Sequence, residues 1–200
     1  MKLDPKTTAL LVIDLQNDTV GEEGAFASSG AAAFAREHGV VEKATLLAEA
    51  FRAAGAEVIH VWHIDEPGHV DSTRNAELYR SIAEADALVR GTWGAAPADG
   101  LEPQAGDHVV EKMRMSGWQG TRLETLLAGL GVDTIVVTGA WTNMSIEHTS
   151  RTGADKGFSM IVPEDGCSTM NADWHTASIN FALQNVAQVT SCAAVKAALG

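Results

Sequence analysis

The sequence predicts an α/β fold in which helices cover both faces of a mainly parallel sheet. Apolar runs of strand length recur along the chain, and the first, TALLVID at 8–14, is unbroken and ends in a charge. An unbroken apolar run is typical of a parallel strand that is buried on both faces. Segments with apolar residues at helical spacing separate these runs, and this alternation indicates crossover connections between parallel strands.

The first half of the chain then supplies a helix, two more strands and a long irregular segment. Residues 35–55 carry apolar positions at helical spacing and end at a glycine, a common helix stop. AEVIHVW at 56–62 and HVVEK at 108–112 are the next expected strands. Between them, 63–107 contains only a polar helix at about 74–88 and a stretch rich in Gly and Pro. A segment this long and irregular more often forms a site than a simple linker.

Strands and helices keep alternating in the second half of the chain. Helices are expected at 120–131, 143–156, 170–184 and over the last residues. The remaining strands are expected at 132–140, 157–165 and 186–191. The result is a six-stranded, mainly parallel sheet in a three-layer α/β/α arrangement of Rossmann-like topology. Neither an internal repeat nor a linker is visible, so we expect one domain over 1–200.

Composition narrows the class of protein. The formal net charge of −12 argues against nucleic acid as a partner, because phosphates select basic surfaces. No apolar run approaches the roughly 20 residues that a membrane-spanning helix needs, and the N-terminus does not have the pattern of a signal peptide. The two cysteines, Cys167 and Cys192, have no metal-binding spacing and are expected to be small buried residues. We therefore expect a reduced, cytoplasmic protein.

Three residues with chemical potential follow predicted strands. Asp14 ends the first strand, Lys112 ends the third, and Ser145 lies just beyond the fourth, in the first turn of a helix. The carboxyl ends of parallel strands converge at one edge of a sheet. A carboxylate and an ammonium there form an acid–base pair, and a hydroxyl at a helix start can attack a carbonyl. Taken singly, each has an ordinary alternative: a turn or cap for Asp14, a solvated Lys112, and a helix cap for Ser145.

The surrounding motifs resemble the isochorismatase-like hydrolase superfamily, also called the cysteine hydrolases. The resemblance covers almost the whole chain, from TALLVIDLQND to the final helix. RGTWGAAPADGLEPQAGDHVVEKMRMSGWQGTRLETLL is similar to ureidoacrylate and biuret amidohydrolases and contains Lys112. TGAWTNMSIEHTSRTGADKGF resembles the segment that carries the nucleophile of those amidases, with Ser145 at its position.

This resemblance implies an amidohydrolase that cleaves a C–N bond of a small amide, ureide or carbamoyl substrate without a cofactor. Asp14, Lys112 and position 145 would form the catalytic triad. A non-proline cis peptide is implied between Ala140 and Trp141, with the backbone N–H groups of Trp141 and Ser145 as the oxyanion hole. Because members of the family are commonly oligomeric, a homodimer or homotetramer is implied.

Ser145 stands where the amidases have Cys, and three explanations compete. Ser145 replaces a natural cysteine, or it is native and a weak or silent nucleophile, since a hydroxyl needs a stronger base than a thiol. Alternatively, the chain is similar to the true isochorismatases, which cleave a vinyl ether with Asp14 alone. WTN at 141–143 and the RGTWG string favour the amidase branch. A ligand-binding relative that has lost its chemistry is the non-enzymatic alternative. With Ser145 in place we expect a slow or stalled cycle.

The substrate pocket is expected to be aromatic, because the chain has five Trp and one Tyr. Any one Trp can instead be part of the core. The candidate substrate-binding residues are Trp93, Trp118 and Trp141, with Trp62 as a further possibility, and Asn17, His69, Arg114 and Gln119. Asn17 is a candidate to orient Asp14, and Arg114 and Gln119 are candidates to bind a carboxylate or carbonyl.

HVWHIDEPGH at 60–69 invites a metal interpretation through its His and Asp residues. Nicotinamidases of the same superfamily use a D-x-H…H cluster in this segment. Here His63 takes the position of that Asp, Asp65 takes the position of the first His, and only His69 keeps its type. We therefore expect no metal at His60, His63, Asp65 and His69, and interpret the segment as a histidine-containing rim of the pocket.

Overall fold

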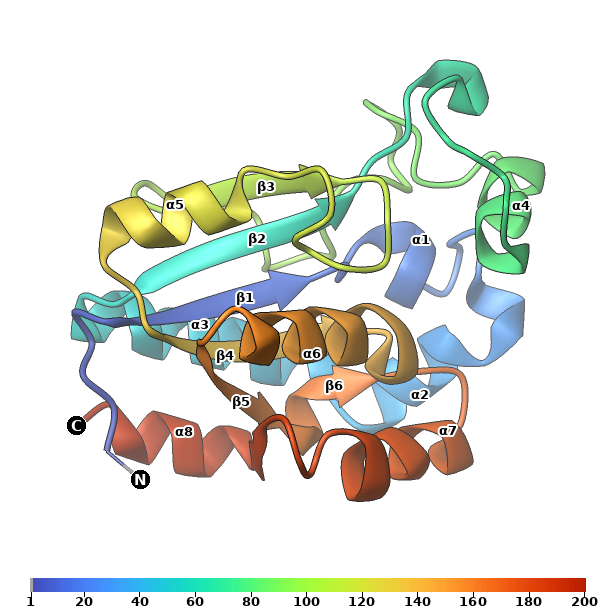
Figure 1. Ribbon diagram of the computed structural model, residues 1–200. Helices are drawn as coiled ribbons and strands as arrows, with labels where there is room; N and C mark the ends of the chain where they lie inside the picture. Colours follow the sequence, from blue (N-terminus) through green and yellow to red (C-terminus); the bar gives the residue numbers. More distant parts are fainter. Residues whose placement is uncertain (1) are drawn as a thin grey trace.

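The computed structural model describes residues 2–200 and contains a parallel sheet with the strand order β3-β2-β1-β4-β5-β7 (Figure 1). The strands are β1 (Thr8–Ile13), β2 (Glu57–His63), β3 (His108–Lys112), β4 (Thr134–Ala140), β5 (Ser159–Pro163), β6 (Cys167–Ser168) and β7 (Gln188–Thr190). The short β6 pairs with β4 off the main path. β1 lies at the centre of the sheet, between β2 and β4.

Eight α-helices and several shorter turns connect the strands of the described part of the chain. The helices are α1 (Asn17–Val20), α2 (Ala31–Glu37), α3 (Val40–Ala54), α4 (Glu77–Glu84), α5 (Leu123–Leu130), α6 (Glu147–Asp155), α7 (Ala172–Ala177) and α8 (Cys192–Ala198). Within residues 2–200, no helix combines the length and the apolar character that a membrane crossing requires.

The predicted architecture is confirmed, with differences in detail. Each of the six predicted strands overlaps an observed one, and the two-residue β6 brings the sheet to seven strands. The predicted helix at 35–55 is two helices, because Gly39 adopts a left-handed backbone (φ 60°) between α2 and α3. The predicted helix at 143–156 begins with the π-helical turn η3 (Thr142–Ile146) before α6. The predicted helix at 170–184 likewise ends in the π-helical turn η5 (Ser178–Ala182) after α7.

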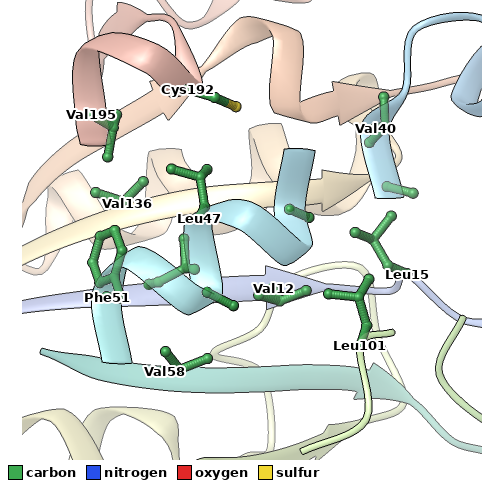
Figure 2. Close-up of a cluster of buried hydrophobic side chains, with 14 of the residues drawn as sticks. Val12, Leu15, Val40, Leu47, Phe51, Val58, Leu101, Val136, Cys192 and Val195 are labelled. Carbon is green, nitrogen blue, oxygen red and sulfur yellow. The ribbon is translucent and has the colours of Figure 1, made fainter. Parts of the chain in front are cut away.

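Two apolar clusters hold the layers together, one on each face of the sheet. Side chains of a strand point alternately to opposite faces, so β1 contributes to both clusters. On one face Leu10 and Val12 pack with Leu47 and Phe51 of α3 (Figure 2). On the other face Leu11 belongs to a cluster that includes residues of α5. Because both faces are covered, the strands carry the unbroken apolar runs that identified them.

The segment between β2 and β3 projects beyond the carboxyl ends of the strands. It contains η2 (Pro67–His69) and α4, and it stands near α1 at the end toward which the arrows of β1, β2 and β3 point (Figure 1). The chain ends lie at the opposite end of the sheet (Figure 1). The interpretation of 63–107 as a site-forming segment is therefore supported by its position.

Candidate active site

The carboxyl ends of β1, β3 and β4 deliver Asp14, Lys112 and Ser145 to one point. Asp14 directly follows β1, Lys112 is the last residue of β3, and Ser145 lies in η3 after β4. The sheet register aligns these ends, because Ile13 pairs with Gly139 and His63 pairs with Lys112. The structure therefore brings these three side chains together, as expected from the sequence.

The three side chains form a closed triangle of polar contacts. Ser145 Oγ donates a hydrogen bond of 2.6 Å to Asp14 Oδ2. Lys112 Nζ lies 2.7 Å from the same oxygen and 3.3 Å from Ser145 Oγ. All three residues are buried, with exposed fractions of 5% for Asp14, 2% for Lys112 and 5% for Ser145. The positive lysine therefore compensates the buried carboxylate directly, as a charge in an apolar interior requires.

One oxygen of this triangle has no partner. Asp14 Oδ1 is buried, and no group among the described residues donates a hydrogen bond to it. A buried carboxylate oxygen without a donor is rare in native proteins, and in a cavity it is a natural acceptor for a ligand N–H. Asp14 also has a left-handed backbone (φ 51°), which is uncommon for a residue with a side chain. Its main-chain carbonyl accepts a hydrogen bond from Thr19 Oγ1, which closes the turn.

Close packing of backbones brings β4 next to Asp14. Gly139 has a φ of 132°, and a Cβ on it would lie 2.0 Å from the carbonyl oxygen of Ile13. Only glycine therefore allows this approach. The next peptide bond, Ala140–Trp141, is cis, as the resemblance implied. The chain then enters η3, and π-helical turns of this kind occur frequently at functional sites.

A small cavity opens onto the triangle. Asp14, Lys112, Ser145 and His63 are its ionisable and nucleophilic lining groups. Much of the remaining surface is what we call the apolar wall, which consists of Phe26, Leu78, Ile82, Leu88, Met115 and Met144. Thr19, Ala140 and Trp141 complete the lining, and the Trp141 ring meets Phe26 edge to face at 5.3 Å. The cavity is therefore polar at one pole and apolar elsewhere.

The prediction that several tryptophans line the pocket holds only for Trp141. Trp118 is buried in the core cluster beside α5, where its ring stacks on Phe158 at 5.3 Å and its Nε1 donates to the carbonyl of Thr149. Trp93 is 55% exposed and contributes to the site region only through its backbone carbonyl. The cavity lining includes neither of them, nor Trp62, whose ring packs against His60.

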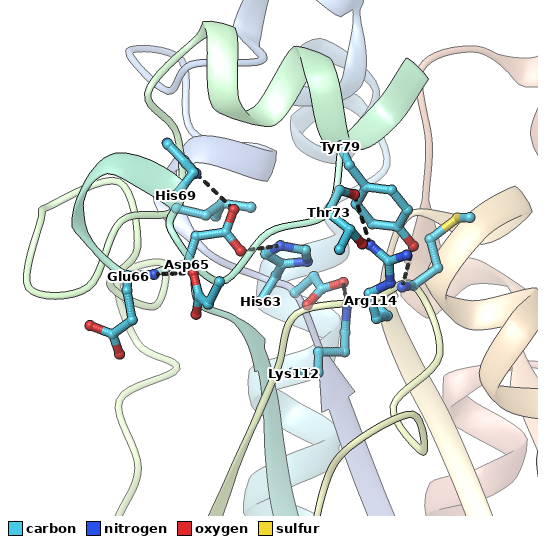
Figure 3. A network of polar contacts seen from close by, with 12 residues as sticks. His63, Asp65, Glu66, His69, Thr73, Tyr79, Lys112 and Arg114 are labelled. Carbon is cyan, nitrogen blue, oxygen red and sulfur yellow. Dashed lines mark hydrogen bonds and ion pairs between the residues drawn. The ribbon is translucent and has the colours of Figure 1, made fainter. Parts of the chain in front are cut away.

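Three polar candidates also lie outside the cavity lining. Arg114 covers the ring of Tyr79 at 4.0 Å and donates to the Thr73 carbonyl and to Asn75 (Figure 3). Gln119 is exposed. Asn17 does not orient Asp14, because its Nδ2 donates to the carbonyl of Trp93 at 2.8 Å. Long-range packing decides these three positions, and short motifs carry little information about it.

A second buried carboxylate lies beside the site. Asp65 Oδ1 is 3.1 Å from His63 Nε2, and Asp65 Oδ2 is 2.8 Å from His69 Nδ1 (Figure 3). Burial by itself would raise the pKa of Asp65, but the hydrogen bonds from both histidines outweigh it and hold that pKa below its usual range. His69 Nε2 continues to the exposed Asp86 at 3.3 Å.

The histidines of the 60–69 segment lie in different surroundings. His63 lines the cavity, as the rim interpretation predicted, whereas His69 does not. His60 lies apart and pairs with Asp107, and burial lowers the pKa of its ring. Within residues 2–200, no group of three or more potential ligands has a geometry that could hold a metal ion.

Sequence reasoning missed two residues of the DLQND motif that shape the site. Gln16 Nε2 donates to the carbonyls of His63 and Ala95, and its Oε1 accepts from the N–H of His63. Asp18 accepts from the N–H of Leu88 at 2.7 Å. These polar residues directly after the first strand were visible, but nothing in the sequence indicated which backbone they would bind.

Neither cysteine is a replacement nucleophile. Cys167 is 1% exposed, and burial raises its pKa to about 12. Burial also raises the pKa of the Cys192 thiol. Thiols with raised pKa values carry almost no thiolate at neutral pH. Both side chains are small buried residues, as predicted, and neither lines the cavity.

Comparison with known proteins places these features in a family. The model of the isochorismatase domain matches residues 8–194. Isochorismatase family protein YecD of Escherichia coli O157:H7 is 34% identical over 197 residues, which cover 96% of this chain and 95% of that protein. Ureidoacrylate amidohydrolase RutB of Rhizobium rhizogenes is 29% identical over 184 residues, or 86% of this chain and 74% of that one.

A solved structure agrees with the sequence comparisons. The crystal structure of a cysteine hydrolase from Pseudomonas syringae pv. phaseolicola superposes with a TM-score of 0.86 at 28% sequence identity. The match covers 100% of this chain and 95% of that one.

Proposed function

Because the chain belongs to the isochorismatase family, we propose that it is an amidohydrolase acting on small carboxamides, ureides or carbamoyl compounds, with Ser145 as nucleophile. One observation carries the proposal: Ser145 Oγ donates a 2.6 Å hydrogen bond to a buried carboxylate, Asp14, that also contacts Lys112. A hydroxyl in hydrogen-bond contact with a base is the arrangement that nucleophilic catalysis needs.

The acylation step follows from these contacts. Asp14 accepts the hydroxyl proton as Ser145 Oγ forms a bond to the substrate carbonyl carbon. The negative charge moves to the carbonyl oxygen, for which the backbone N–H groups of Trp141 and Ser145 are the proposed donors. Asp14 then gives its proton to the nitrogen, the C–N bond breaks, and ammonia or an amine leaves. Lys112 holds the carboxylate in position at the start of the cycle through its 2.7 Å contact with Asp14 Oδ2.

Hydrolysis of the acyl-enzyme repeats the same proton transfers, with water in place of Ser145 as the nucleophile. Water enters the space that the amine left, Asp14 accepts one of its protons, and the remaining hydroxide adds to the ester carbon. Collapse of this second tetrahedral intermediate breaks the bond to Ser145 Oγ, which recovers its proton from Asp14. The cycle returns every group to its first state and releases the carboxylic or carbamic acid.

Ser145 limits the rate of this cycle. A serine hydroxyl is a far weaker acid than a thiol, so Asp14 has to remove its proton against a larger difference in acidity than a cysteine would present. We therefore propose slow turnover for this chain. We expect the Ser145→Cys variant to be faster, because Lys112 lies within reach of position 145 and favours a thiolate there.

The test measures ammonia release from a panel of small amides and ureides by the unaltered protein, Ser145→Cys and Ser145→Ala. Release by the first two and none by Ser145→Ala supports the proposal. Ser28→Cys is the matched control, because it adds a thiol at an exposed position outside the cavity. Equal release by the unaltered protein and Ser145→Ala would remove Ser145 from the mechanism. Vinyl-ether cleavage that requires Asp14 but not Ser145 would favour the isochorismatase reaction instead.

A further inference from the structure

Resting on the proposed amide hydrolysis, we infer that the substrate is a small uncharged amide with an apolar acyl group. A substrate that carries a carboxylate, as ureidoacrylate does, is selected against by the same cavity. The inference depends on four features: the apolar wall, the commitment of the only lysine in the lining, the engagement of the neighbouring arginines, and the two polar atoms that stay available.

The apolar wall leaves a carboxylate without partners. Leu78 and Ile82 come from α4, and Met115 follows β3. Phe26 and Met144 complete the side of the cavity around Trp141. Hydrocarbon and thioether side chains donate no hydrogen bonds that could replace the water around an anion, so moving a carboxylate against them costs several kcal/mol. The same surface gains from contact with an alkyl or aryl group.

The only lysine or arginine in the lining is not free to bind an anion. Lys112 Nζ lies 2.7 Å from Asp14 Oδ2, so its charge is already paired. A substrate carboxylate near Lys112 would also approach the Asp14 carboxylate, and two like charges at such a distance repel each other. The polar pole of the cavity therefore suits a neutral carbonyl group better than a second anion.

The neighbouring arginines are held elsewhere. Arg114 covers the Tyr79 ring and donates to Thr73 and Asn75 (Figure 3). Arg90 makes hydrogen bonds to Glu66 and Glu111 outside the cavity. Guanidinium groups are the usual partners of substrate carboxylates, because they bind both oxygens at once. In the described part of the chain, neither of these two guanidinium groups lines the cavity.

Asp14 and His63 line the cavity, and each has a polar atom without a partner among the described residues that matches a group of a neutral amide. Asp14 Oδ1 has no donor within residues 2–200 and accepts an amide N–H, a group that a carboxylate does not possess. His63 lines the cavity with its Nε2 committed to Asp65, and its Nδ1 bonds to no other described residue. This nitrogen is available for one further hydrogen bond to the substrate. Together these atoms orient an amide head group while the acyl group contacts the apolar wall.

Isovaleramide and malonamate give a matched pair of probes. They share the primary amide and the same number of non-hydrogen atoms, but malonamate carries a carboxylate where isovaleramide carries an isopropyl group. We expect kcat/KM for ammonia release by the Ser145→Cys variant to be at least about tenfold higher for isovaleramide, which corresponds to roughly 1.4 kcal/mol. Equal or better turnover of malonamate would overturn the inference while the proposed function stood.

Binding separates this inference from the proposed function. If no compound of the amide and ureide panel releases ammonia, the proposed function fails, and Ser145→Ala then provides the decisive measurement. Ligand-observed NMR on that variant compares the Kd of isovaleramide with that of malonamate without any turnover. Tighter binding of isovaleramide by about tenfold or more supports the uncharged ligand class. Equal binding, or tighter binding of malonamate, rejects it.

A charge placed in the apolar wall sharpens the test. Leu78 is half-buried on α4 and lines the cavity, so Leu78→Arg adds a guanidinium with room to reach it. We expect the preference for isovaleramide over malonamate to fall by at least about fivefold, because the carboxylate gains a charged partner. Leu78→Met changes the shape but not the charge and should retain the preference. An unchanged preference in a folded Leu78→Arg protein would show that the acyl group does not contact this wall.

Discussion

Asp14 and Asp65 are both buried aspartates next to the same cavity, yet their hydrogen bonding differs. Asp65 has a donor for each oxygen, His63 for Oδ1 and His69 for Oδ2. Asp14 receives both of its contacts, from Lys112 and Ser145, on Oδ2 and has none on Oδ1. A carboxylate whose oxygens are all satisfied stabilises the fold. A buried carboxylate oxygen without a donor is unusual in a native fold, and in a cavity it is suited to accept a hydrogen bond from a ligand.

The two aspartates also differ in what they hold in place. Asp65 fixes the ring of His63, which lines the cavity, and so acts on the pocket through another residue. Asp14 contacts the proposed nucleophile itself. The comparison therefore predicts that loss of Asp14 abolishes activity, and that loss of Asp65 lowers stability while most of the activity remains.

The largest expected effect is on catalysis by Asp14→Asn. An amide in place of the carboxylate cannot take the proton of Ser145, so we expect ammonia release to fall by about 10³-fold or more. The shape is conserved, but the buried ammonium of Lys112 loses its charged partner, so the free energy of unfolding should also fall, by about 3–5 kcal/mol, and the midpoint of thermal unfolding should fall with it. Steady-state kinetics and a thermal melt on the same sample check both parts. An active Asp14→Asn protein would contradict the assigned role.

Asp65→Asn should lower stability but leave most of the activity. The amide nitrogen cannot accept a hydrogen bond, so one of the two histidines loses its partner inside the protein. We expect the free energy of unfolding in urea to fall by about 1–3 kcal/mol. Ammonia release should fall by less than about tenfold, since Asp65 touches neither Ser145 nor Lys112. A loss of activity as large as that of Asp14→Asn would erase the distinction between the two aspartates.

The pH dependence of stability sharpens the comparison further. The pKa of Asp65 is lower in the folded protein than the ordinary value of about 3.9, so the unfolded chain binds a proton first as the pH falls. The stability that Asp65 provides is therefore complete above about pH 5 and is lost as the pH drops below about 4. The difference in unfolding free energy between the unaltered protein and Asp65→Asn should shrink over that range. Urea titrations at a series of pH values measure it.

Trp93→Ala is expected to have the smallest effect. The Trp93 side chain is more than half exposed and lies outside the cavity lining. Because only its backbone carbonyl contacts Asn17, the truncation leaves that bond in place. We expect the free energy of unfolding to change by less than about 0.5 kcal/mol and KM for amides to stay within about twofold. A large increase in KM would restore Trp93 to the pocket.

The strand ends were predictable because one physical rule governs them. Unbroken apolar runs identify parallel strands, and parallel strands bring their carboxyl ends together. The sequence pattern alone therefore predicts that Asp14, Lys112 and Ser145 lie close together. Local pattern was enough here, because each residue's position depends on its own strand and on the sheet. The two-residue β6 was not predicted, since a segment so short has no periodicity to detect.

The pocket wall was predictable only in location. The irregular segment between the second and third strands was expected to form it and contributes Leu78, Ile82 and Leu88 to the lining, whereas most of the residues proposed to bind substrate lie outside that lining. Trp118 and Trp93 both follow glycine-containing loops, and nothing in the local sequence distinguishes a ring that packs on Phe158 from one that faces a cavity. The side-chain direction of Arg114 was not predictable for a similar reason, because its partners lie about 40 residues away in the chain. Tertiary packing determines such orientations.

The hydrogen bonds that anchor the segment between β2 and β3 have a consequence for how the substrate specificity of this protein can change. Gln16, Asn17 and Asp18 hold the segment between β2 and β3 through its backbone, at the carbonyls of Ala95 and Trp93 and the N–H of Leu88. Nearly every amino acid supplies the same backbone groups. Side chains that face the cavity can therefore be exchanged while the frame that carries them stays in place. Evolution, or a laboratory library at these positions, can thus vary specificity with little risk to folding.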